Sequence, residues 1–333
     1  MTTTPVERAL PNAAVVYQPF KTDLAALQAS VARHETRLGW APTQWYETAE
    51  HDAGLSAARR AVADGASVVL AAGGDGTVRA VAEGMRGSGV PMAVVPQGTG
   101  NLLARNLGMP LGSIETSVRA AFTGKNRPVD LGLLTIIRED ETESTHVFLV
   151  LAGMGLDART ITATKSRLKK RVGWLAYVDA GLRTMIKDRP LKIHYSVNRE
   201  PAKPLSVYTV MIGNCGLLPG GVLLIPDAEI DDGMLDVVAL RPLGPFSWLR
   251  IWNKIGWENG VLRKSKAGRM IIDLVNDTKS VNYLRARDYM LSVPQPEPIQ
   301  LDGDGFGLAV AVNGTVDPGG LIVRVLPEWT PAT

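Results

Sequence analysis

The sequence predicts an α/β chain whose first part is a doubly wound parallel sheet and whose second part is built mainly of strands. Short apolar runs alternate with helical patterns between Ala13 and Pro96, which is typical of parallel strands joined by crossover helices. The alternation stops after Pro128, and the later apolar runs are rich in Val and Ile, as strands are. A chain of 333 residues is long enough for two domains.

The composition is that of an ordinary globular protein, with 45% apolar and 21% charged residues. A net charge of +3 and a pI near 8.9 permit an acidic partner but do not require one, and we expect no nucleic-acid partner. The single cysteine, Cys215, excludes a disulfide framework and a zinc site of several cysteines. Residues 1–11 lack the apolar core of a signal peptide, and no apolar run is long enough to span a bilayer. We therefore expect a cytoplasmic protein.

The N-terminal elements are expected in the order strand, helix, strand, helix. The apolar run Ala13–Tyr17 ends at Gln18-Pro19, and Asp23 is suited to cap a helix over residues 24–38. The alternation continues with a strand at Thr43–Thr48, a helix through Leu55, Ala58 and Val62, and a strand at Met92–Pro96. Doubly wound sheets bind ligands at the carboxyl ends of their strands.

The stretch Val68–Met85 combines a strand, a glycine turn and a helix. The turn is Gly73-Gly74-Asp75-Gly76-Thr77, and apolar residues recur at helical spacing after it. A glycine turn at the start of a helix presents N–H groups to an anion and lets phosphate oxygens approach the backbone. Asp75 would repel a bare phosphate, so it fits this turn if Mg²⁺ accompanies the phosphate or if Asp75 accepts a proton. A solvated aspartate in a tight turn is the simpler alternative.

A second turn of the same kind follows the next strand. The segment Pro96-Gln97-Gly98-Thr99-Gly100-Asn101 separates the strand Met92–Pro96 from a helix at Leu102–Leu107. Alone, this segment could be ordinary turn chemistry. As the second of a pair, it predicts that loops from two neighbouring strands form facing walls of one phosphate site.

These motifs resemble the diacylglycerol kinase catalytic domain family, which includes bacterial diacylglycerol kinases, sphingosine kinases and ceramide kinases. GGDGT at 73–77 is shared with NAD kinases and phosphofructokinases, but its combination with GTGNLLARNL at 98–107 is more specific. Four later motifs extend the resemblance over nearly the whole chain: Val129-Asp130-Leu131-Gly132, Ala152-Gly153-Met154-Gly155-Leu156-Asp157-Ala158, Asp231-Asp232-Gly233-Met234-Leu235-Asp236 and Leu301-Asp302-Gly303-Asp304.

The resemblance implies a nucleotide-binding α/β domain of the NAD kinase and phosphofructokinase type, followed by a β-sandwich domain with a helical insert. The first domain would comprise residues 1–127 with a C-terminal return at 317–333, and the second would comprise residues 128–316. Strands of the second part and of the return are expected at Leu131–Ile137, Val147–Leu151, Leu191–Val197, Ser206–Ile212, Met234–Leu240, Met270–Leu274, Gly307–Val312 and Leu321–Val325.

The resemblance also implies which residues bind ATP and Mg²⁺. The nucleotide would be held by Gly73, Gly74, Gly76, Thr77, Gly98, Thr99 and Asn101, with Thr48 and Lys21 as weaker candidates beside the phosphates. Asp75 would organise Mg²⁺ or accept the proton, and Asp304 is the other candidate for the general base. Asp130 would support the metal network, and Asp157 would face the headgroup of the acceptor lipid. Asp232 would bind a structural Mg²⁺, although an ordinary Asp-Gly turn explains the same residues.

Two positions depart from the family's pattern. Many bacterial diacylglycerol kinases have Asn-Asp after the Gly-Thr turn, whereas this chain has Asn101-Leu102. That form resembles the sphingosine and ceramide kinase branch, and it removes one carboxylate from the expected Mg²⁺ network. The family's Asp-Gly-Glu is here Asp302-Gly303-Asp304, so the last acid is one methylene shorter and needs a closer approach to its target.

Two segments fit contact with a membrane surface. Residues 159–199 are strongly basic around an expected helical insert at Thr160–Lys187, which fits either anionic lipid headgroups or a solvated face. Pro245–Leu262 carries three tryptophans beside basic residues, and these fit either a membrane interface or, slightly better, a packed core. We expect peripheral association with the inner face of the membrane, and a homodimer is compatible with the sequence.

The sequence favours an ATP-dependent lipid kinase that converts diacylglycerol to a phosphatidate, with a sphingoid base or another lipid as the alternative acceptor. A kinase for a soluble acceptor such as NAD is less favoured, because the Asn-Glu or Asn-Asp pair expected some tens of residues after GGDG is missing. A non-catalytic nucleotide-binding or lipid-binding protein has only Leu102 in its favour, and the intact Asp75 and Asp304 oppose it.

Overall fold

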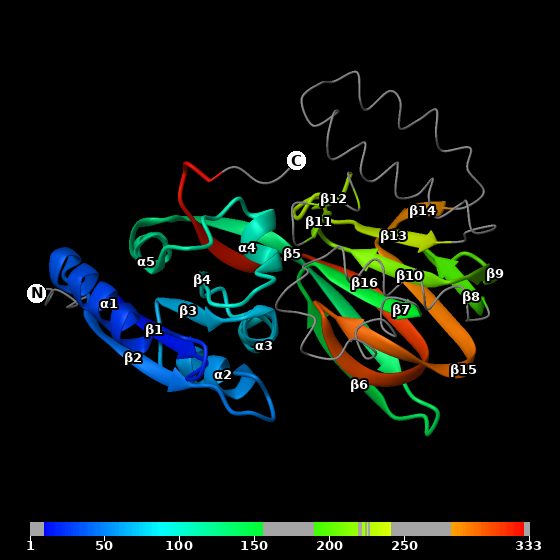
Figure 1. Cartoon of the computed structure of the whole chain (residues 1–333), viewed down its shortest axis with the longest axis horizontal. Helices are drawn as coiled ribbons and strands as arrows, with labels where there is room; N and C mark the ends of the chain where they lie inside the picture. The colour runs from blue at the N-terminus through cyan, green and yellow to red at the C-terminus, as the bar shows by residue number, and fades with distance from the viewer. Residues whose placement is uncertain are drawn as a thin grey trace, which may run out of the picture. The chain divides into compact units, whose positions relative to one another are not determined.

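The computed structural model describes residues 10–155, 190–218, 222–223, 225, 227–240 and 281–329. The chain divides into two compact units (Figure 1): the first is Met1–Pro128 with Leu321–Thr330, and the second contains Val129–Gly320. Two strands, β5 (Lys125–Ile137) and β16 (Asp304–Val325), run through the limits of these units. Among the described residues, no helix is long and apolar enough to cross a membrane.

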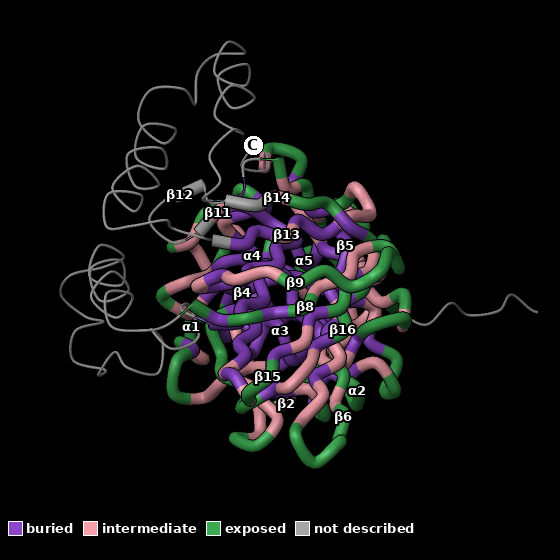
Figure 2. The backbone as a smooth tube through the Cα atoms, turned by 90° about the vertical axis from the view of Figure 1, so that its right-hand side faces the viewer, coloured by how far each residue is buried: buried purple, intermediate pink, exposed green. Residues whose placement is uncertain are grey.

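The first unit contains the doubly wound parallel sheet that the alternation predicts. Its strands are β1 (Asn12–Tyr17), β2 (Ala41–Glu47), β3 (Val68–Gly73), β4 (Met92–Pro96) and the end of β16, in the order β2-β1-β3-β4-β16. All these pairs are parallel, and β3 and β4 are buried along their whole length. Figure 2 colours the backbone of the chain by burial. The winding direction changes between β1 and β3, and a sheet of this order binds ligands at that switch point.

Helices cover both faces of this sheet (Figure 1). Helices α1 (Leu24–Leu38) and α5 (Ile114–Thr123) pack against alternate strand residues on one face, and α2 (Leu55–Ala63) and α3 (Asp75–Met85) pack against each other on the other face. α1 begins as predicted, because Asp23 accepts a hydrogen bond from Ala26 N at 3.1 Å. The contact of α2 with α3 needs a glycine, since a Cβ on Gly84 would lie 2.6 Å from the Leu55 carbonyl oxygen.

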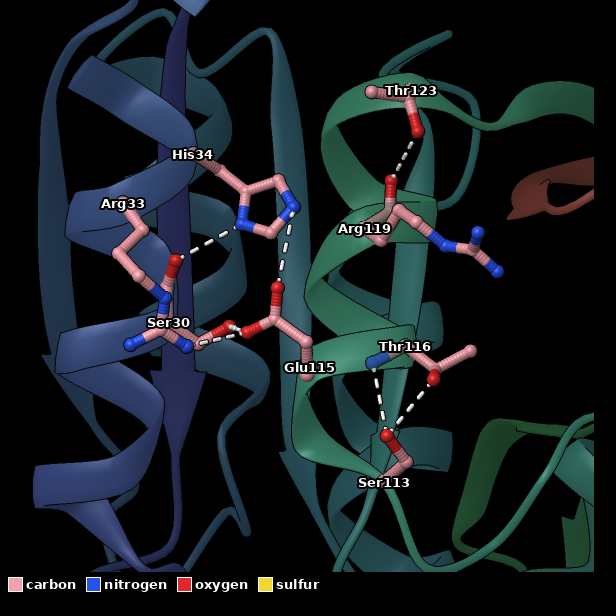
Figure 3. A network of polar contacts seen from close by, with 8 residues as sticks. All are labelled: Ser30, Arg33, His34, Ser113, Glu115, Thr116, Arg119 and Thr123. Carbon is pink, nitrogen blue, oxygen red and sulfur yellow. Dashed lines mark hydrogen bonds and ion pairs between the residues drawn. The ribbon is translucent and has the colours of Figure 1, made fainter. Parts of the chain in front are cut away.

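A polar network joins α1 to α5 (Figure 3). Glu115 accepts a hydrogen bond from Ser30 Oγ at 2.6 Å and pairs with Arg33 Nη2 at 2.5 Å. The buried His34 ring bonds the Ser30 carbonyl oxygen through Nδ1 at 3.0 Å, and its Nε2 lies 3.7 Å from Glu115. The hydrogen bond from Ser30 is the main cause that lowers the pKa of Glu115. A carboxylate of α5 is thus held by three residues of α1.

The second unit packs antiparallel ladders around one apolar core, as a β-sandwich does. One ladder has the order β14-β13-β10-β7-β15, in which the strands are β7 (Leu151–Gly155), β10 (Thr209–Gly213), β13 (Leu235–Leu240), β14 (Val281–Ala286) and β15 (Asp288–Leu301). The remaining pairs are β15 with β16, β8 (Leu191–Val197) with β9 (Lys203–Val207) and with β15, β5 with β6 (Glu143–Phe148) and with β16, and β11 (Leu217–Leu218) with β12 (Val222–Leu223). The core contains residues of several of these strands, including Phe148 of β6, Ile193 of β8 and Ile212 of β10.

The strand β15 joins the ladder β14-β13-β10-β7 to the hairpin of β8 and β9. Its first residues pair with β8, and its last residues pair with β7. Between these parts, its register with β16 is irregular from Ser292 to Glu297. Irregularities of this kind let a strand bend from one sheet of a sandwich into the other.

Several strands differ from the sequence-based expectation. Val147–Leu151 is not one strand, because β6 ends at Phe148 and β7 begins at Leu151. Ser206–Ile212 spans the end of β9 and most of β10, whereas Gly307–Val312 and Leu321–Val325 both belong to β16. Three expected segments lie outside the described residues: Thr160–Lys187, Pro245–Leu262 and Met270–Leu274.

Candidate active site

The two glycine turns lie at the carboxyl ends of neighbouring strands in the first unit. One joins β3 to α3, and the other joins β4 to the short helix α4 (Leu102–Asn106). The two strands pair up to Gly73 and Pro96, and Gln97 N donates to the Gly73 carbonyl oxygen at 2.9 Å. The structure therefore brings together the two turns that the sequence singled out.

The turns approach each other so closely that two glycines have no room for a side chain. A Cβ on Gly98 would lie 2.8 Å from Gly74 Cα, and a Cβ on Gly100 would lie 2.3 Å from Asp75 Oδ2. Because both distances are shorter than real Cβ contacts, any larger residue would push the turns apart. Thr99, between these glycines, is exposed.

Asp75 fastens the second turn to the first. Its Oδ2 accepts a hydrogen bond from Asn101 N at 2.9 Å, and its Oδ1 accepts one from Leu102 N at 2.5 Å. These N–H groups stand at the start of α4, where a helix has no carbonyl of its own to accept them. Asp75 thus caps α4 from another element, and these two donors are engaged inside the protein rather than open to a phosphate.

The other predicted residues of the two turns either present backbone N–H groups or shape the turns with their side chains. Gly76 and Thr77 lie in the first turn of α3, so that helix leaves their N–H groups without an internal acceptor. Thr77 is buried against Gly73, because a Cβ added to Gly73 would lie 2.6 Å from the Thr77 side chain. The Asn101 amide instead shapes its own loop, because it donates to Gly98 O at 2.9 Å and accepts from Gly98 N at 3.0 Å.

The turn after β1 brings Lys21 to the glycine turns. Gln18 N and Thr22 Oγ1 both donate to the Ala72 carbonyl oxygen, at 3.0 and 3.2 Å, and fasten this turn to the end of β3. A Cβ on Gly74 would lie 3.8 Å from Lys21 Nζ. Lys21 and Gly74 therefore border the switch point between β1 and β3. Thr48 follows β2 at the same edge, where its N–H donates to Tyr17 O at 3.0 Å.

Two further residues join this region although the sequence motifs did not assign them a role. Arg105 Nε donates to Gly100 O at 2.7 Å and places a guanidinium beside the second turn. Its position one helical turn after Asn101 was a usable sequence clue. Gln18 Oε1 is buried, and within the described part of the chain it has no hydrogen-bond partner. No sequence pattern distinguishes Gln18 beyond its place after β1.

The hairpin between β15 and β16 carries the candidate base of the second unit. Asp302 and Gly303 have φ of 48° and 91°, the left-handed conformations that a two-residue Asp-Gly hairpin turn uses. Asp302 is 5% exposed and accepts hydrogen bonds at 2.7–2.9 Å from the N–H groups of residues 149, 150 and 151. This explains the break between β6 and β7. Asp304 begins β16 with an exposed side chain, so Asp304 is the acid of this hairpin that a substrate can reach.

The other predicted metal ligands of the second unit are engaged by protein groups. Asp130 is 3% exposed and accepts hydrogen bonds from Gly233 N at 2.6 Å and Gly319 N at 2.7 Å. Asp232 accepts from Met234 N at 2.9 Å and pairs with Arg285. No group of three or more His, Cys, Asp or Glu side chains that could hold a metal occurs among the described residues. Asp157 lies outside them.

An apolar pocket of the second unit is lined by residues of β8, β9, β10, β13, β14 and β15. Its lining includes Ile193, Leu205, Val237 and Tyr289. The Tyr289 hydroxyl is buried and has no hydrogen-bond partner among the described residues, and burial raises its pKa. The lining of the pocket is therefore mainly apolar.

Two family models match this chain in sequence. The model described as diacylglycerol kinase catalytic domain matches residues 13–134, and the model described as YegS C-terminal NAD kinase beta sandwich-like domain matches residues 150–325. A Pseudomonas aeruginosa protein named "Probable lipid kinase YegS-like" is 32% identical over 279 residues, which are 81% of this chain and 80% of that protein. A Bacillus subtilis protein named "Diacylglycerol kinase" is 26% identical over 271 residues, which are 79% of this chain and 81% of that protein.

Solved structures share the fold. A diacylglycerol kinase from Bacillus anthracis has a TM-score of 0.66 at 15% identity and covers 96% of this chain and 99% of its own. Yeast NADH kinase, solved with NADH, has a TM-score of 0.53 at 9% identity and covers 98% of this chain and 89% of its own. At these identities the likeness shows the fold alone, and it confirms the predicted fold class.

Proposed function

Because this chain belongs to the family of lipid kinases that combine a diacylglycerol kinase catalytic domain with a YegS-type C-terminal domain, we propose that it uses ATP to phosphorylate the hydroxyl of a neutral lipid. The acceptor we propose is diacylglycerol, which would give a phosphatidate. A sphingoid base or another lipid alcohol is the alternative, since Asn101-Leu102 has the form of the sphingosine and ceramide kinase branch.

The observation that carries this proposal is the contact of the two glycine turns at the switch point of the first unit. The N–H groups of Gly76 and Thr77 lie at the start of α3, where they are suited to bind an anion. Lys21 places positive charge near Gly74 and Arg105 places it beside Gly100, which suits a triphosphate. Phosphoryl transfer depends mainly on such positioning and charge neutralisation.

Asp75 is the residue of this region whose chemistry fits Mg²⁺. It is only half-buried, and an ionised carboxylate has about four lone-pair sites, so it can accept more than the N–H groups of Asn101 and Leu102. A magnesium ion held there with the nucleotide would neutralise charge on the transferred phosphoryl group. Leu102, which stands where many bacterial relatives have an aspartate, supports Asp75 through its backbone N–H instead.

Asp304 is our candidate for the general base, with Asp75 as the alternative. In the proposed reaction, the lipid hydroxyl oxygen forms a bond to the γ-phosphorus, the bond from the γ-phosphorus to its bridging oxygen breaks, and ADP leaves. The hydroxyl proton passes to the Asp304 carboxylate. The hairpin suits this task because Asp302 fastens it through three hydrogen bonds while Asp304 stays exposed.

We also propose that the protein acts at an anionic membrane surface on the cytoplasmic side. The basic residues between 159 and 199 would approach the headgroups, and Asp157 would face the acceptor headgroup. Replacing Lys169, Lys170 and Arg171 by Glu should weaken sedimentation with anionic vesicles, because each basic residue near such a surface contributes about 1 kcal/mol. Unchanged sedimentation would leave this segment as a solvated basic face.

The lipid kinase proposal is tested by offering the purified full chain ATP radiolabelled at its γ-phosphorus, Mg²⁺ and a panel of acceptors in mixed micelles. The panel contains diacylglycerol, a sphingoid base, ceramide and, without micelles, NAD. Label in diacylglycerol supports the full proposal, and label in a sphingoid base or ceramide supports the lipid kinase with the alternative acceptor. Label only in NAD, or none from folded protein, would overturn it. The variant Asp304→Asn serves as the matched low-activity control.

A further inference from the structure

The turn before β13 is held by an arginine from the neighbouring strand. Arg285 of β14 stands opposite Asp236 of β13 in the antiparallel ladder. Its Nη2 atom pairs with Asp232 Oδ2, and its Nε atom lies 3.4 Å from Asp236 Oδ1. One guanidinium therefore contacts two carboxylates, whose side chains are 17% and 1% exposed.

Protein donors other than Arg285 also bind the carboxylates at this turn. Asp232 Oδ1 accepts a hydrogen bond from Met234 N at 2.9 Å, and Asp236 accepts one from the Tyr283 hydroxyl. Asp130 accepts from Gly233 N and from a second backbone segment. Each of these three carboxylates is thus satisfied by protein donors.

We infer that the Arg285 guanidinium takes the place of a divalent cation at this turn, so that the second unit folds without the structural Mg²⁺ that the family resemblance implies at Asp232. A guanidinium carries a fixed charge and a planar fork of donors that can bind two carboxylates at once. Mg²⁺ instead requires oxygen ligands in near-octahedral geometry at about 2.0–2.1 Å. It would have to displace Arg285 from Asp232, and that displacement would leave the buried Asp236 without its cation.

This inference is independent of the lipid kinase activity, and it concerns a different place from the Mg²⁺ expected with the nucleotide at Asp75. It is tested by thermal unfolding of the full chain without nucleotide, followed by circular dichroism, in EDTA and in millimolar Mg²⁺. The wild type should unfold at the same temperature in both solutions. Arg285→Gln should unfold at a lower temperature in EDTA, and Mg²⁺ should restore part of the loss, because Asp232 and Asp236 are then free to bind it.

Adding Asp232→Asn to Arg285→Gln should abolish the response to Mg²⁺. Arg287→Gln is the matched control, since Arg287 is exposed on the same segment, and it should change neither the unfolding temperature nor the response. If Arg285→Gln unfolds at the wild-type temperature, or is destabilised and Mg²⁺ restores nothing, the inference is wrong.

A second measurement does not depend on whether Arg285→Gln folds. Arg285→Lys keeps a cation at the turn, so both it and the wild type should unfold at temperatures that do not depend on Mg²⁺. An increase with Mg²⁺ in the wild type that disappears in Asp232→Asn would show that the turn binds the metal in the presence of Arg285, and would overturn the inference.

Discussion

Asp75 in the first unit and Asp302 in the second unit both accept backbone N–H groups from a distant segment of the chain. Asp75 binds two of them, at the start of α4, and Asp302 binds three, at the break between β6 and β7. Asp302 is 5% exposed, whereas Asp75 is half-buried at the edge of the sheet where the glycine turns meet. A carboxylate surrounded by N–H donors is committed to structure, and one that stays partly open can also act on a ligand.

The largest effect is expected from Asp75→Ala, which removes both tasks at once. Turnover should fall below detection, because the proposed nucleotide site loses the carboxylate that we expect to organise it. The free energy of unfolding should decrease by about 1–2 kcal/mol, as when a helix loses its N-terminal cap. Label transfer and urea unfolding measure the two losses. Asp75→Asn keeps one acceptor oxygen, so it should lose the turnover and keep most of the stability. Asp75→Ala with activity within a few-fold of wild type would refute the catalytic task.

Asp304→Asn separates chemistry from structure in the second unit. It keeps the size of the side chain but cannot take the proton, and removing a positioned base costs about 10²–10⁴-fold in rate. The free energy of unfolding should stay unchanged, because the side chain is exposed. Single-turnover kinetics with saturating ATP measure the rate. Near wild-type turnover would exclude Asp304 as the base and leave Asp75 to serve both metal and proton.

Asp302→Ala should have the opposite pattern, with stability lost first. Three backbone donors lose their acceptor, and each buried donor left unsatisfied costs about 1–3 kcal/mol. The total is reduced where water enters, so we expect a loss of about 3 kcal/mol or more in urea unfolding. Asp302→Asn keeps one acceptor and should be intermediate. A fully stable Asp302→Ala would show that the N–H groups of residues 149–151 find other partners, and that the comparison with Asp75 fails.

Gly100→Ala tests whether the contact between the turns matters. The added Cβ would meet Asp75 Oδ2 at 2.3 Å, and overpacking of this kind costs about 1–3 kcal/mol. The Michaelis constant for ATP should increase as the turns separate. Gly112→Ala is the matched control, because nothing lies within 4 Å of its Cβ position. Equal kinetics and stability for the two variants would contradict the contact.

The smallest effect concerns Glu115 and the junction of α1 with α5. The pKa of Glu115 is lowered in the folded protein, so its contribution is complete above its ordinary value of 4.5 and is lost as the pH falls below that value. Because the side chain is 52% exposed, we expect less than about 1 kcal/mol. Unfolding at a series of acidic pH values should show a shallower decline in Glu115→Gln than in the wild type. Parallel declines would show that Glu115 does not contribute to the pH dependence of the stability.

Local patterns in the sequence were sufficient to predict the strands β1 to β4, the helices α1 to α4 and the two glycine turns of the first unit. Strand and helix periodicities, the cap at Asp23 and the two glycine turns each depend on a few adjacent residues. The partners of Asp75 and Asp302 were beyond such reasoning, because they lie 26 and 27 residues away in one case and 151–153 in the other. The pairing of Asp232 with Arg285 spans 53 residues and depends equally on the register of two strands.

Helix α5 is a different case, because it was not predicted although a local pattern was present. Ser113 caps it by accepting a hydrogen bond from Thr116 N at 3.1 Å, and Ile114, Val118 and Phe122 recur at helical spacing. The apolar run Val147–Leu151 was predicted as a strand, but the structure divides it between β6 and β7. It looks like one strand in sequence, and only the three hydrogen bonds to Asp302 reveal that two strands meet there.

The return of β16 to the first unit has a consequence for the order of folding. Val323 pairs with Met92 of β4, and Arg324 reaches Asn126 and the Ala121 carbonyl oxygen. On the ribosome, residues 321–325 emerge after residues 129–320 of the second unit, so the first unit cannot complete its sheet until those residues have been synthesised, although N-terminal domains generally fold first. A translation pause within the second unit would leave β4 as an open, wholly apolar edge strand. We therefore expect this edge of the first unit, rather than any surface of the finished protein, to be where chaperones engage the chain during its synthesis.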